Sequence, residues 1–478
     1  MGSATGKNVV LFPFPGQGHF AAFLSFAGVL RRALPDDVAI TLVSTPGNVA
    51  TLRRRASSGA AQECPFLAFR ELPFVPADHG LPPGCESADG IPPIRIIELL
   101  EAFETLQPAF DDFIAGAGDV VCVVSDPFVA WTVAVARRRG CAHAFFASCG
   151  AFGSAVVHSL WSRLPVRPDA AGRDLLPEHP DVVIDRSQVP SYSIRDDATA
   201  GDDPAAAFFG RQIPLGYQTD TVLINTVEEF EPTGLAMLRR ALKLPVFAIG
   251  PLVRASSGPI SPGTDTAAAV VSFLDSHPPS SVLYISFGSQ ISIRAEHMAE
   301  LAAALETTGR PFVWAAKPPD GHDIKGAIRP EWLEERVTAT KKGLVLHGWA
   351  PQVSILAHPS TGAFLSHCGW NSVLESVTRG VPIIGWPLAG EQFYNAKMLD
   401  EEWGVCVEAA RGNAEGAAVE KGALAAAVET VMGPTAKAAE MRRRAGVIKA
   451  IMEAAREEGD GSSARKALEE SFKAMKLK

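Results

Sequence analysis

Aromatic and polar side chains between residues 349 and 392 follow the ends of predicted strands, where they could bind a nucleotide. Trp349 comes just after a short strand predicted at 342–347. A ring beyond a strand end in an α/β sheet suits stacking on a flat base. After a second predicted strand, at 362–367, a turn containing Gly369 leads into an apolar helix. The free N–H groups at such a helix start favour a phosphate, and glycine allows that phosphate close to the backbone.

Carboxylate and amide groups further along the segment could bind sugar hydroxyls. Asn371 and Glu375 are four residues apart, so they share one helix face, with Asn371 toward a phosphate and Glu375 toward a ribose hydroxyl. Glu391 and Gln392 follow a third predicted strand at 381–386, and a carboxylate beside an amide suits paired bonds to vicinal hydroxyls. A single Trp or His near a strand end is more often a packing residue. Three successive strand ends with suitable chemistry favour a site for a nucleotide diphosphate that carries a sugar.

The 44 residues from Trp349 to Gln392 resemble the signature box of plant family-1 UDP-sugar glycosyltransferases in length and pattern. The resemblance implies that this segment holds uridine at its start, ribose and diphosphate in its middle and the sugar at its end, where a final Gln goes with glucose. Family members often have Asp in place of Glu391, and Glu keeps the same acceptor chemistry. The donor-site residues implied are Ser289, Trp349, Ala350, Gln352, His367, Gly369, Trp370, Asn371, Ser372, Glu375, Glu391 and Gln392. For Ser289, which follows a strand predicted at 282–287, a purely structural turn is an equally supported alternative.

His19 and Asp126 both follow predicted parallel strands in the first half of the chain. The strands at 8–14 and 39–44 flank a predicted helix at 20–34, which is a βαβ unit. The intervening loop formally fits the dinucleotide fingerprint G-x-G-x-x-A, but no acidic residue ends the second strand, so a dehydrogenase is disfavoured. An imidazole oriented by a carboxylate is a suitable general base for a hydroxyl group.

The alternative for this pair is structural, with Asp126 as a helix N-cap and His19 in a turn. The two residues match the catalytic pair of the family that the chain resembles, and this match favours catalysis. Family members usually have Pro three residues after this His, where the chain has Ala22. That departure affects the beginning of the helix and leaves the chemistry of the pair unchanged.

A chain of 478 residues is too long for one ordinary core, and two domains of roughly 200 to 250 residues are expected. We predict an acceptor-binding domain at 1–252, a linker at 253–265 that is rich in Ser, Pro and Gly, and a donor-binding domain at 266–457. The resemblance implies that a final helix at 458–478 returns to the first domain. The resemblance implies the α/β fold class of GT-B type, in which two Rossmann-like domains with parallel sheets face each other across a cleft.

Composition excludes several functional classes. The hydrophobic content of 47% and the charged content of 20% are typical of a globular protein, and a net charge of −9 argues against a nucleic-acid partner. The seven cysteines form no C-x-x-C pair, which favours a reducing compartment over disulfides or zinc. No secretory segment or apolar stretch of about 18 residues is visible, so we expect a cytoplasmic protein without a membrane span. The chain is expected to be a monomer.

Together these features predict an inverting UDP-glycosyltransferase, a hexosyltransferase that uses His19 as base and Asp126 as its orienting partner. The donor is expected to be UDP-glucose, with no permanently bound cofactor and no metal, because no D-x-D motif occurs in the chain. The acceptor implied by the resemblance is a small apolar metabolite such as a flavonoid, another phenolic or a terpenoid. Four phenylalanines are candidates for lining its pocket, although such residues more often belong to the core: Phe14, Phe128, Phe145 and Phe146.

Two alternatives stay open at the level of sequence. One is a GT-B relative that acts on the nucleotide sugar itself, such as an epimerase or hydrolase. The other is a non-catalytic protein that binds UDP-sugars, which the presence of both His19 and Asp126 disfavours.

Overall fold

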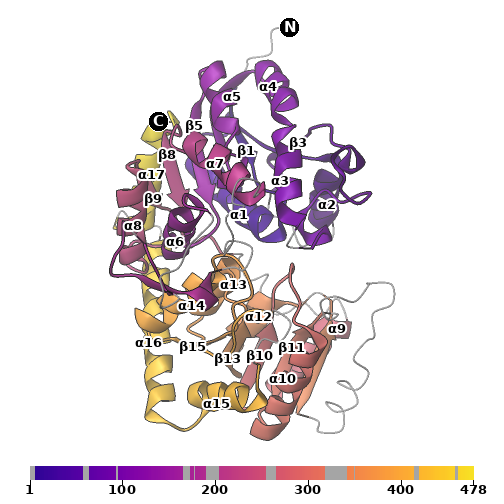
Figure 1. Ribbon diagram of the computed structural model, residues 1–478, viewed down its shortest axis with the longest axis vertical. Helices are drawn as coiled ribbons and strands as arrows, with labels where there is room; N and C mark the ends of the chain where they lie inside the picture. The colour runs from indigo at the N-terminus through magenta and orange to yellow at the C-terminus, as the bar shows by residue number, and fades with distance from the viewer. Residues whose placement is uncertain are drawn as a thin grey trace. The chain divides into compact units, whose positions relative to one another are not determined.

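The computed structural model describes residues 6–57, 64–92, 95–164, 173–176, 178–189, 204–253, 265–317, 342–348, 350–413, 419–457 and 461–477. The chain forms two compact units. The first contains Met1–Val253 together with Ala455–Lys478, and the second contains Arg254–Ala454. Each unit has its own parallel sheet covered by helices (Figure 1).

The first unit is built on a seven-stranded parallel sheet with the order β3-β2-β1-β4-β5-β8-β9. Its central strands are almost continuously buried, as expected for a parallel sheet with both faces covered. The order places β4 at the centre with β1 beside it, so segments about 110 residues apart are neighbours. The strands are β1 (Lys7–Phe12), β2 (Ala39–Ser44), β3 (Leu67–Glu71), β4 (Asp119–Ser125), β5 (Ala142–Ala147), β8 (Thr221–Ile224) and β9 (Val246–Ala248).

Helices pack on both faces of this sheet, and the alternation of strand side chains separates two cores. On β1, Val9 and Leu11 join one core while Val10 and Phe12 join the other. The C-terminal helix α17 (Ser463–Ala474) packs on β9 and β8, with Phe472 in the same core as Val9. The other helices are α1 (Gln17–Ala33), α2 (Pro46–Ser57), α3 (Ile96–Glu104), α4 (Gln107–Gly116), α5 (Thr132–Arg139), α6 (Ala151–Trp161), α7 (Pro204–Gly216) and α8 (Pro232–Leu242). A small antiparallel pair is formed by β6 (Arg173–Leu175) and β7 (Val183–Asp185).

The second unit has a six-stranded parallel sheet with the order β12-β11-β10-β13-β14-β15. The strands are β10 (Val282–Ser286), β11 (Phe312–Ala316), β12 (Gly343–His347), β13 (Thr361–Ser366), β14 (Ile383–Gly385) and β15 (Cys406–Glu408). Its helices are α9 (Asp265–Asp275), α10 (Ala295–Thr308), α12 (Gln352–Ala357), α13 (Trp370–Val377), α14 (Gln392–Glu401), α15 (Lys421–Met432) and α16 (Ala436–Arg456). Although β12 and β13 are consecutive in the chain, β11 and β10 lie between them in the sheet.

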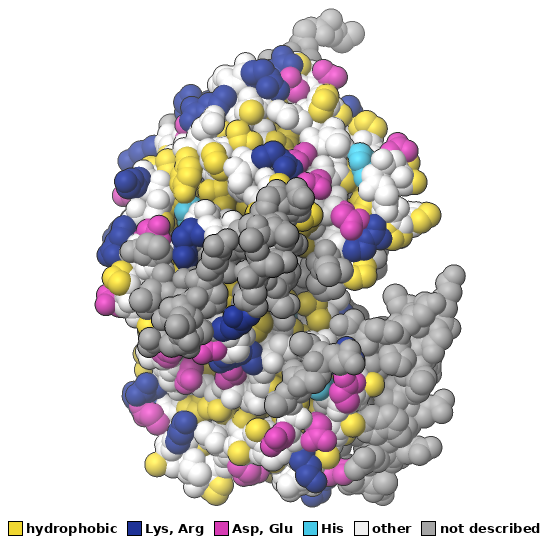
Figure 2. Space-filling model, in the orientation of Figure 1, with side chains coloured by type: hydrophobic (Ala, Val, Ile, Leu, Met, Phe, Trp, Pro, Cys, Tyr) yellow, Lys and Arg dark blue, Asp and Glu magenta, His cyan; other side chains and the backbone are white. Residues whose placement is uncertain are grey.

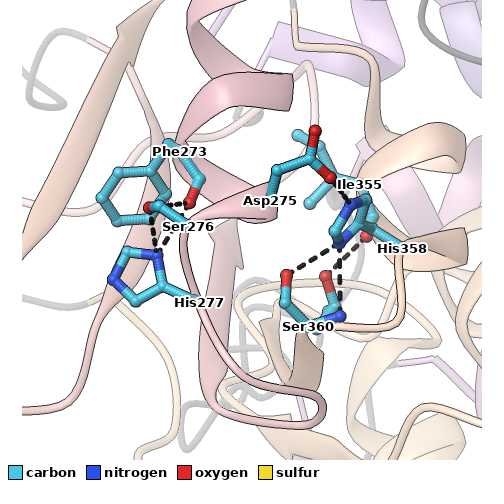
Figure 3. A network of polar contacts seen from close by, with 8 residues as sticks. Phe273, Asp275, Ser276, His277, Ile355, His358 and Ser360 are labelled. Carbon is cyan, nitrogen blue, oxygen red and sulfur yellow. Dashed lines mark hydrogen bonds and ion pairs between the residues drawn. The ribbon is translucent and has the colours of Figure 1, made fainter.

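Polar side chains fasten the amino end of β13 to the end of α9 (Figure 3). His358 Nε2 lies 3.2 Å from Asp275 Oδ1, and His358 Nδ1 lies 2.8 Å from Ser360 Oγ. The main-chain N–H of Ser360 also donates to His358 Nδ1. Because Nδ1 accepts this hydrogen, Nε2 carries the ring proton and donates to the carboxylate of Asp275. This network holds the edge of the sheet opposite to the carboxyl ends of its strands.

No helix among the described residues is both long enough and apolar enough to cross a bilayer.

Candidate active site

His19 and Asp126 are in direct contact at the carboxyl edge of the first sheet. His19 Nδ1 lies 2.6 Å from Asp126 Oδ2, and the carboxylate is 1% exposed while the imidazole is 19% exposed. The contact arises because β1 and β4 are neighbours in register, with Phe12 opposite Ser125, so the residues that follow both strands meet. The helix that carries the histidine begins at Gln17 and not at Phe20 as predicted, because Gly16 is its extended N-cap. His19 therefore lies in the first turn of α1, and Ala22 is buried one turn later.

Asp126 serves two partners at once. Its Oδ1 accepts a hydrogen bond from the Phe128 N–H at 3.1 Å and so caps the short helix Pro127–Val129. Its Oδ2 faces His19. The capping role and the imidazole contact, which the sequence presented as alternatives, both occur. With both oxygens bound, the carboxylate is fixed in orientation.

The contact between Asp126 and Nδ1 determines which ring nitrogen of His19 is basic. An ionised carboxylate can only accept, so Nδ1 donates and Nε2 keeps its lone pair. Ser148, which follows β5, places its Oγ 3.1 Å from the same Nδ1. The arrangement provides an imidazole whose Nε2 can take a proton, with a buried carboxylate to stabilise the imidazolium that results.

Aromatic rings surround His19. Phe14 lies edge-on to the imidazole with ring centroids 5.1 Å apart, and the Phe128 ring is 5.9 Å away. Phe128 also contacts Trp161 at 5.6 Å, and Trp161 stacks on Phe209 at 4.0 Å. Trp161 and Phe209 belong to the wall of a cavity of about 290 Å³ between the end of α6 and α7. Its lining residues are Trp161, Ser162, Leu164, Ala206, Phe209, Gly210, Ile213, Pro214 and Tyr217.

Of the four candidate acceptor phenylalanines, Phe146 lies on the other face of the first sheet from Phe14. Phe145 and Phe146 are consecutive on β5, so they point to opposite faces of the sheet. Phe146 is fully buried and packs against Phe23 and Phe26 in the core on the far face from Phe14, which makes its assignment to an acceptor pocket wrong. Phe145 is 5% exposed and lies edge-on to the buried His143.

In the second unit, Gln352 joins two neighbouring helices through its carboxamide. Its Nε2 donates to Glu375 Oε2 at 2.8 Å and to Ser372 Oγ at 3.0 Å, and its Oε1 accepts from Tyr284 at 3.2 Å. The side chains of Ser372 and Glu375 are on α13, whereas Gln352 is the first residue of α12. Three of the predicted donor-site residues are thus brought together at the carboxyl edge of the second sheet.

The turn from β13 into α13 has a special backbone. Cys368 has a positive φ of 62°, and Gly369 is the extended N-cap of the eight-residue helix α13. Ser366 Oγ accepts from the Cys368 N–H at 3.1 Å, and the fully buried Asn395 donates to the Cys368 carbonyl at 3.0 Å. Asn395 is on α14, the helix that begins at Gln392. These bonds hold the turn so that the first N–H groups of α13 are at the sheet edge, where an anion is favoured.

His367 is enclosed by two glycines beside this turn. A Cβ at Gly369 would lie 2.4 Å from His367 Nε2, and one at Gly288 would lie 2.6 Å from it, so only glycine fits at either position. The pKa of His367 is lowered to about 4, mainly by burial and in addition by the positive charge of Lys317, while a bond to the backbone of Ser286 acts in the opposite direction. The ring is therefore neutral near pH 7, where it can form hydrogen bonds without contributing charge.

Lys317 is a residue of this edge that sequence reasoning missed. It follows β11 directly, and its ammonium group donates to the carbonyl of Ser289, which is itself at the end of β10. The signal was the same one that identified the other candidates, namely a polar residue immediately after a buried strand.

The remaining predicted donor residues differ in burial and in the hydrogen bonds that they form. Glu391 is the N-cap residue of α14, and Gln392 Oε1 accepts from the N–H groups of Leu388 and Ala389 at 2.9 and 3.1 Å. The carboxamide oxygen is thus bound within the loop. Asn371 is half-buried in the first turn of α13, Trp370 is 3% exposed, and Ala350 packs against the core beside β12. Trp349 lies outside the described residues.

Known proteins are similar to this chain over almost its whole length. Residues 254–443 match the family model for UDP-glucoronosyl and UDP-glucosyl transferase. UDP-glycosyltransferase 92A1 of Arabidopsis thaliana is 36% identical over 489 residues, covering 98% of each chain. Crocetin glucosyltransferase 3 of Crocus sativus is 37% identical over 435 residues, covering 87% of this chain and 89% of that protein.

Solved structures of plant glycosyltransferases have the same fold as this chain. UGT73P12 of Glycyrrhiza uralensis, in a crystal structure complexed with glycyrrhetinic acid 3-O-monoglucuronide, superposes with a TM-score of 0.81 and 27% identity, covering 98% of this chain and 96% of that one. These matches confirm the predicted family and fold class. The chain belongs to the plant family-1 UDP-glycosyltransferases, enzymes of the GT-B fold that transfer sugars to small plant metabolites.

Proposed function

We propose that this enzyme is an inverting UDP-glucosyltransferase whose acceptor is a hydroxyl group of a small apolar metabolite, with His19 as general base. The observation that carries the proposal is the 2.6 Å contact between His19 Nδ1 and the buried Oδ2 of Asp126. This contact leaves Nε2 as the basic nitrogen of a part-exposed imidazole. A general base of this kind needs an orienting partner, and the carboxylate of Asp126 supplies it.

The proposed reaction forms one bond and breaks one bond at the anomeric carbon of the sugar. Nε2 of His19 takes the proton of the acceptor hydroxyl while the oxygen attacks the anomeric carbon from the face opposite UDP. The bond between that carbon and the diphosphate oxygen breaks, and UDP leaves with the bonding electrons. An α-linked donor therefore gives a β-linked product. Asp126 stabilises the imidazolium during this step.

The donor is proposed to be held by the carboxyl edge of the second sheet. Glu375, fixed by Gln352, is placed to accept from a ribose hydroxyl, and the start of α13 offers N–H groups to the diphosphate. Glu391 and the NH2 group of Gln392 are the proposed partners of the sugar, because the Gln392 oxygen is already bound by Leu388 and Ala389. Trp349 is proposed to stack on the uracil. The family model, which includes UDP-glucosyl transferases, supports UDP-glucose as the donor.

The acceptor is proposed to bind against the rings beside His19. The half-buried Phe128 offers apolar surface next to the base, with the buried Phe14 packed beside it, and the row of rings continues through Trp161 to Phe209. An apolar, planar acceptor suits such a lining. Two relatives support the class, because one is named for crocetin and the other was solved with a glycyrrhetinic acid glucuronide.

Incubation with UDP-glucose and a panel of phenolic and terpenoid acceptors tests the function, with products identified by mass spectrometry. The expected result is a mass increase of one hexose that depends on the acceptor. A control without acceptor separates the alternatives, since an epimerase would convert the sugar and a hydrolase would release glucose. UDP-glucose binding without turnover of any acceptor would contradict the proposal and favour a binding protein.

Replacing Glu375 with Ala is expected to weaken binding of both UDP and uridine about 10- to 100-fold, because a hydrogen bond to a charged group contributes about 1.5–3 kcal/mol. Both ligands contain the ribose that Glu375 is proposed to bind. Calorimetric titration measures the two dissociation constants. Glu401→Ala is the matched control, because Glu401 is an exposed residue paired with Lys397 at the end of α14 and should leave both constants unchanged. Unaltered uridine binding by Glu375→Ala would exclude the ribose contact.

EDTA is expected to leave the rate of sugar transfer unchanged. The proposed diphosphate contacts are main-chain N–H groups and protein side chains, so the departing UDP needs no divalent cation. Initial rates are compared in buffer, in EDTA and after magnesium is added back. Strong inhibition that magnesium reverses would show that a metal takes part.

A further inference from the structure

Lys317 lies where β11 and β10 end side by side. The two strands are parallel and in register, with Ser286 opposite Ala315, so Lys317 is next to the turn at Gly288 and Ser289. Its ammonium group donates a hydrogen bond to the Ser289 carbonyl. Gly288 has a φ of 75°, a left-handed conformation that glycine adopts readily and that turns the chain at this edge. The ammonium group is thus anchored at the carboxyl edge of the second sheet.

The same turn is in contact with the start of α13. The position of a Cβ on Gly288 is 2.6 Å from His367 Nε2, and the corresponding position on Gly369 is 2.4 Å from the same atom. Gly288 and Gly369 therefore enclose the imidazole of His367 from two sides. Ser289, which accepts from Lys317, directly follows Gly288. The charge of Lys317 is near enough to His367 to help lower the pKa of that imidazole. Lysine, imidazole and helix start form one group of anion-binding candidates.

A full positive charge stabilises a leaving diphosphate in addition to the dipoles around it. When the bond to the sugar breaks, negative charge develops on the terminal phosphate of UDP. The helix start contributes partial charges, and His367 is neutral because its pKa is about 4. A lysine ammonium is a point charge suited to phosphate, and it is most effective when fixed before the reaction begins. The bond to Ser289 provides that fixation.

We propose that Lys317 is a cation of the donor site and that its ammonium group stabilises the diphosphate of the UDP-sugar, above all as UDP departs. This inference rests on the proposed function and adds to it a residue outside the 349–392 segment. The competing explanation is structural, in which Lys317 only holds the turn at Ser289. The two explanations differ in which ligands they affect, because a charge contact depends on the phosphates while a deformed turn would disturb the whole site.

The experiment measures binding of UDP, UMP and uridine to three variants by calorimetry, together with steady-state transfer from UDP-glucose. Lys317→Met removes the charge and keeps much of the side-chain length, and Lys317→Arg restores the charge. Lys342→Met is the matched control. Lys342 is an exposed residue that precedes β12, at the opposite edge of the same sheet, with its ammonium group beside Gly309.

For Lys317→Met, the Kd of UDP is expected to rise about 10-fold or more, with a smaller effect on UMP and none on uridine. The kcat for transfer is expected to fall about 10²- to 10³-fold, the order found when one preorganised electrostatic group is lost. Lys317→Arg should recover most of both losses, and Lys342→Met should match the wild type in every measurement.

The outcomes that overturn the proposal are distinct from those that overturn the function. If the wild type binds UDP and Lys317→Met binds it equally well with unchanged kcat, Lys317 is not a cation of the site. An equal loss of UDP and uridine affinity would assign the lysine to holding the turn, and would also overturn the proposal. If the wild type itself neither binds UDP nor transfers glucose, the proposed function fails, and the inference fails with it.

Discussion

Replacement of His19 with Ala is expected to reduce kcat for glucosyl transfer by about 10²- to 10⁴-fold, the range typical for loss of a general base. The imidazole is the proposed acceptor of the hydroxyl proton, and alanine has no group that could take it. The affinity for UDP should be unchanged, because the proposed donor contacts are all in the second unit. Rapid-quench or steady-state kinetics gives kcat, and calorimetry gives the Kd of UDP.

His19→Gln is the matched variant for this test. Glutamine can form hydrogen bonds at the same place but cannot act as a base near pH 7, so it should be as inactive as alanine. Added imidazole is expected to restore part of the activity of His19→Ala, since the small ring can occupy the space that is lost. Transfer by either variant at a rate near that of the wild type would remove His19 from the proposed chemistry.

Asp126→Asn is expected to lower kcat by up to about 10⁴-fold, the effect of the corresponding change in a Ser-His-Asp enzyme. The asparagine oxygen can still accept from the Phe128 N–H and keep the cap, which leaves the NH2 group facing His19. An NH2 group can only donate, so Nδ1 must become the acceptor and the ring proton must move to Nε2. In that tautomer, Nε2 cannot take the proton of the acceptor hydroxyl.

The control for this substitution is available within the same unit. Asp185 caps the short helix Arg186–Gln188 by the same type of bond, with its Oδ1 accepting from the Ser187 N–H at 2.9 Å. Asp185→Asn should leave kcat unchanged. A similar loss of activity in both variants would mean that helix capping, and not the tautomer of His19, explains the effect at Asp126. Wild-type kcat in Asp126→Asn would exclude an orienting role for the carboxylate.

The sequence predicted the strands of both units closely, and the reason is local. Strands of a buried parallel sheet are short apolar runs that end at polar or glycine residues. The run predicted at 39–44 is β2 without change, and the one predicted at 362–367 is β13 shifted by a single residue. The predicted sharing of one helix face by Asn371 and Glu375 also depends only on local spacing, and α13 covers both residues. Most of the candidate donor residues could be predicted because they are in one segment, where local spacing is enough to identify them.

Contacts between distant segments were decided by tertiary structure. The order of strands in the sheet is not the order in the chain, so β12 is separated from β13 by two strands, and Lys317 is next to Ser289. The face to which Phe145 and Phe146 point depends on the register of β5 between its neighbours, which the spacing of two consecutive phenylalanines cannot reveal.

The sequence by itself therefore determined which residue types stand at the strand ends, because hydrophobic runs and the polar residues that terminate them are written consecutively along the chain. Only the tertiary structure decided which of these ends meet. His19 and Asp126 are 107 residues apart, and their 2.6 Å contact exists because β1 pairs with β4. The physical reason is that strand pairing brings together residues that are far apart in the chain. A buried carboxylate is stable only when both of its oxygens have partners, and here the paired strand and the following turn supply them.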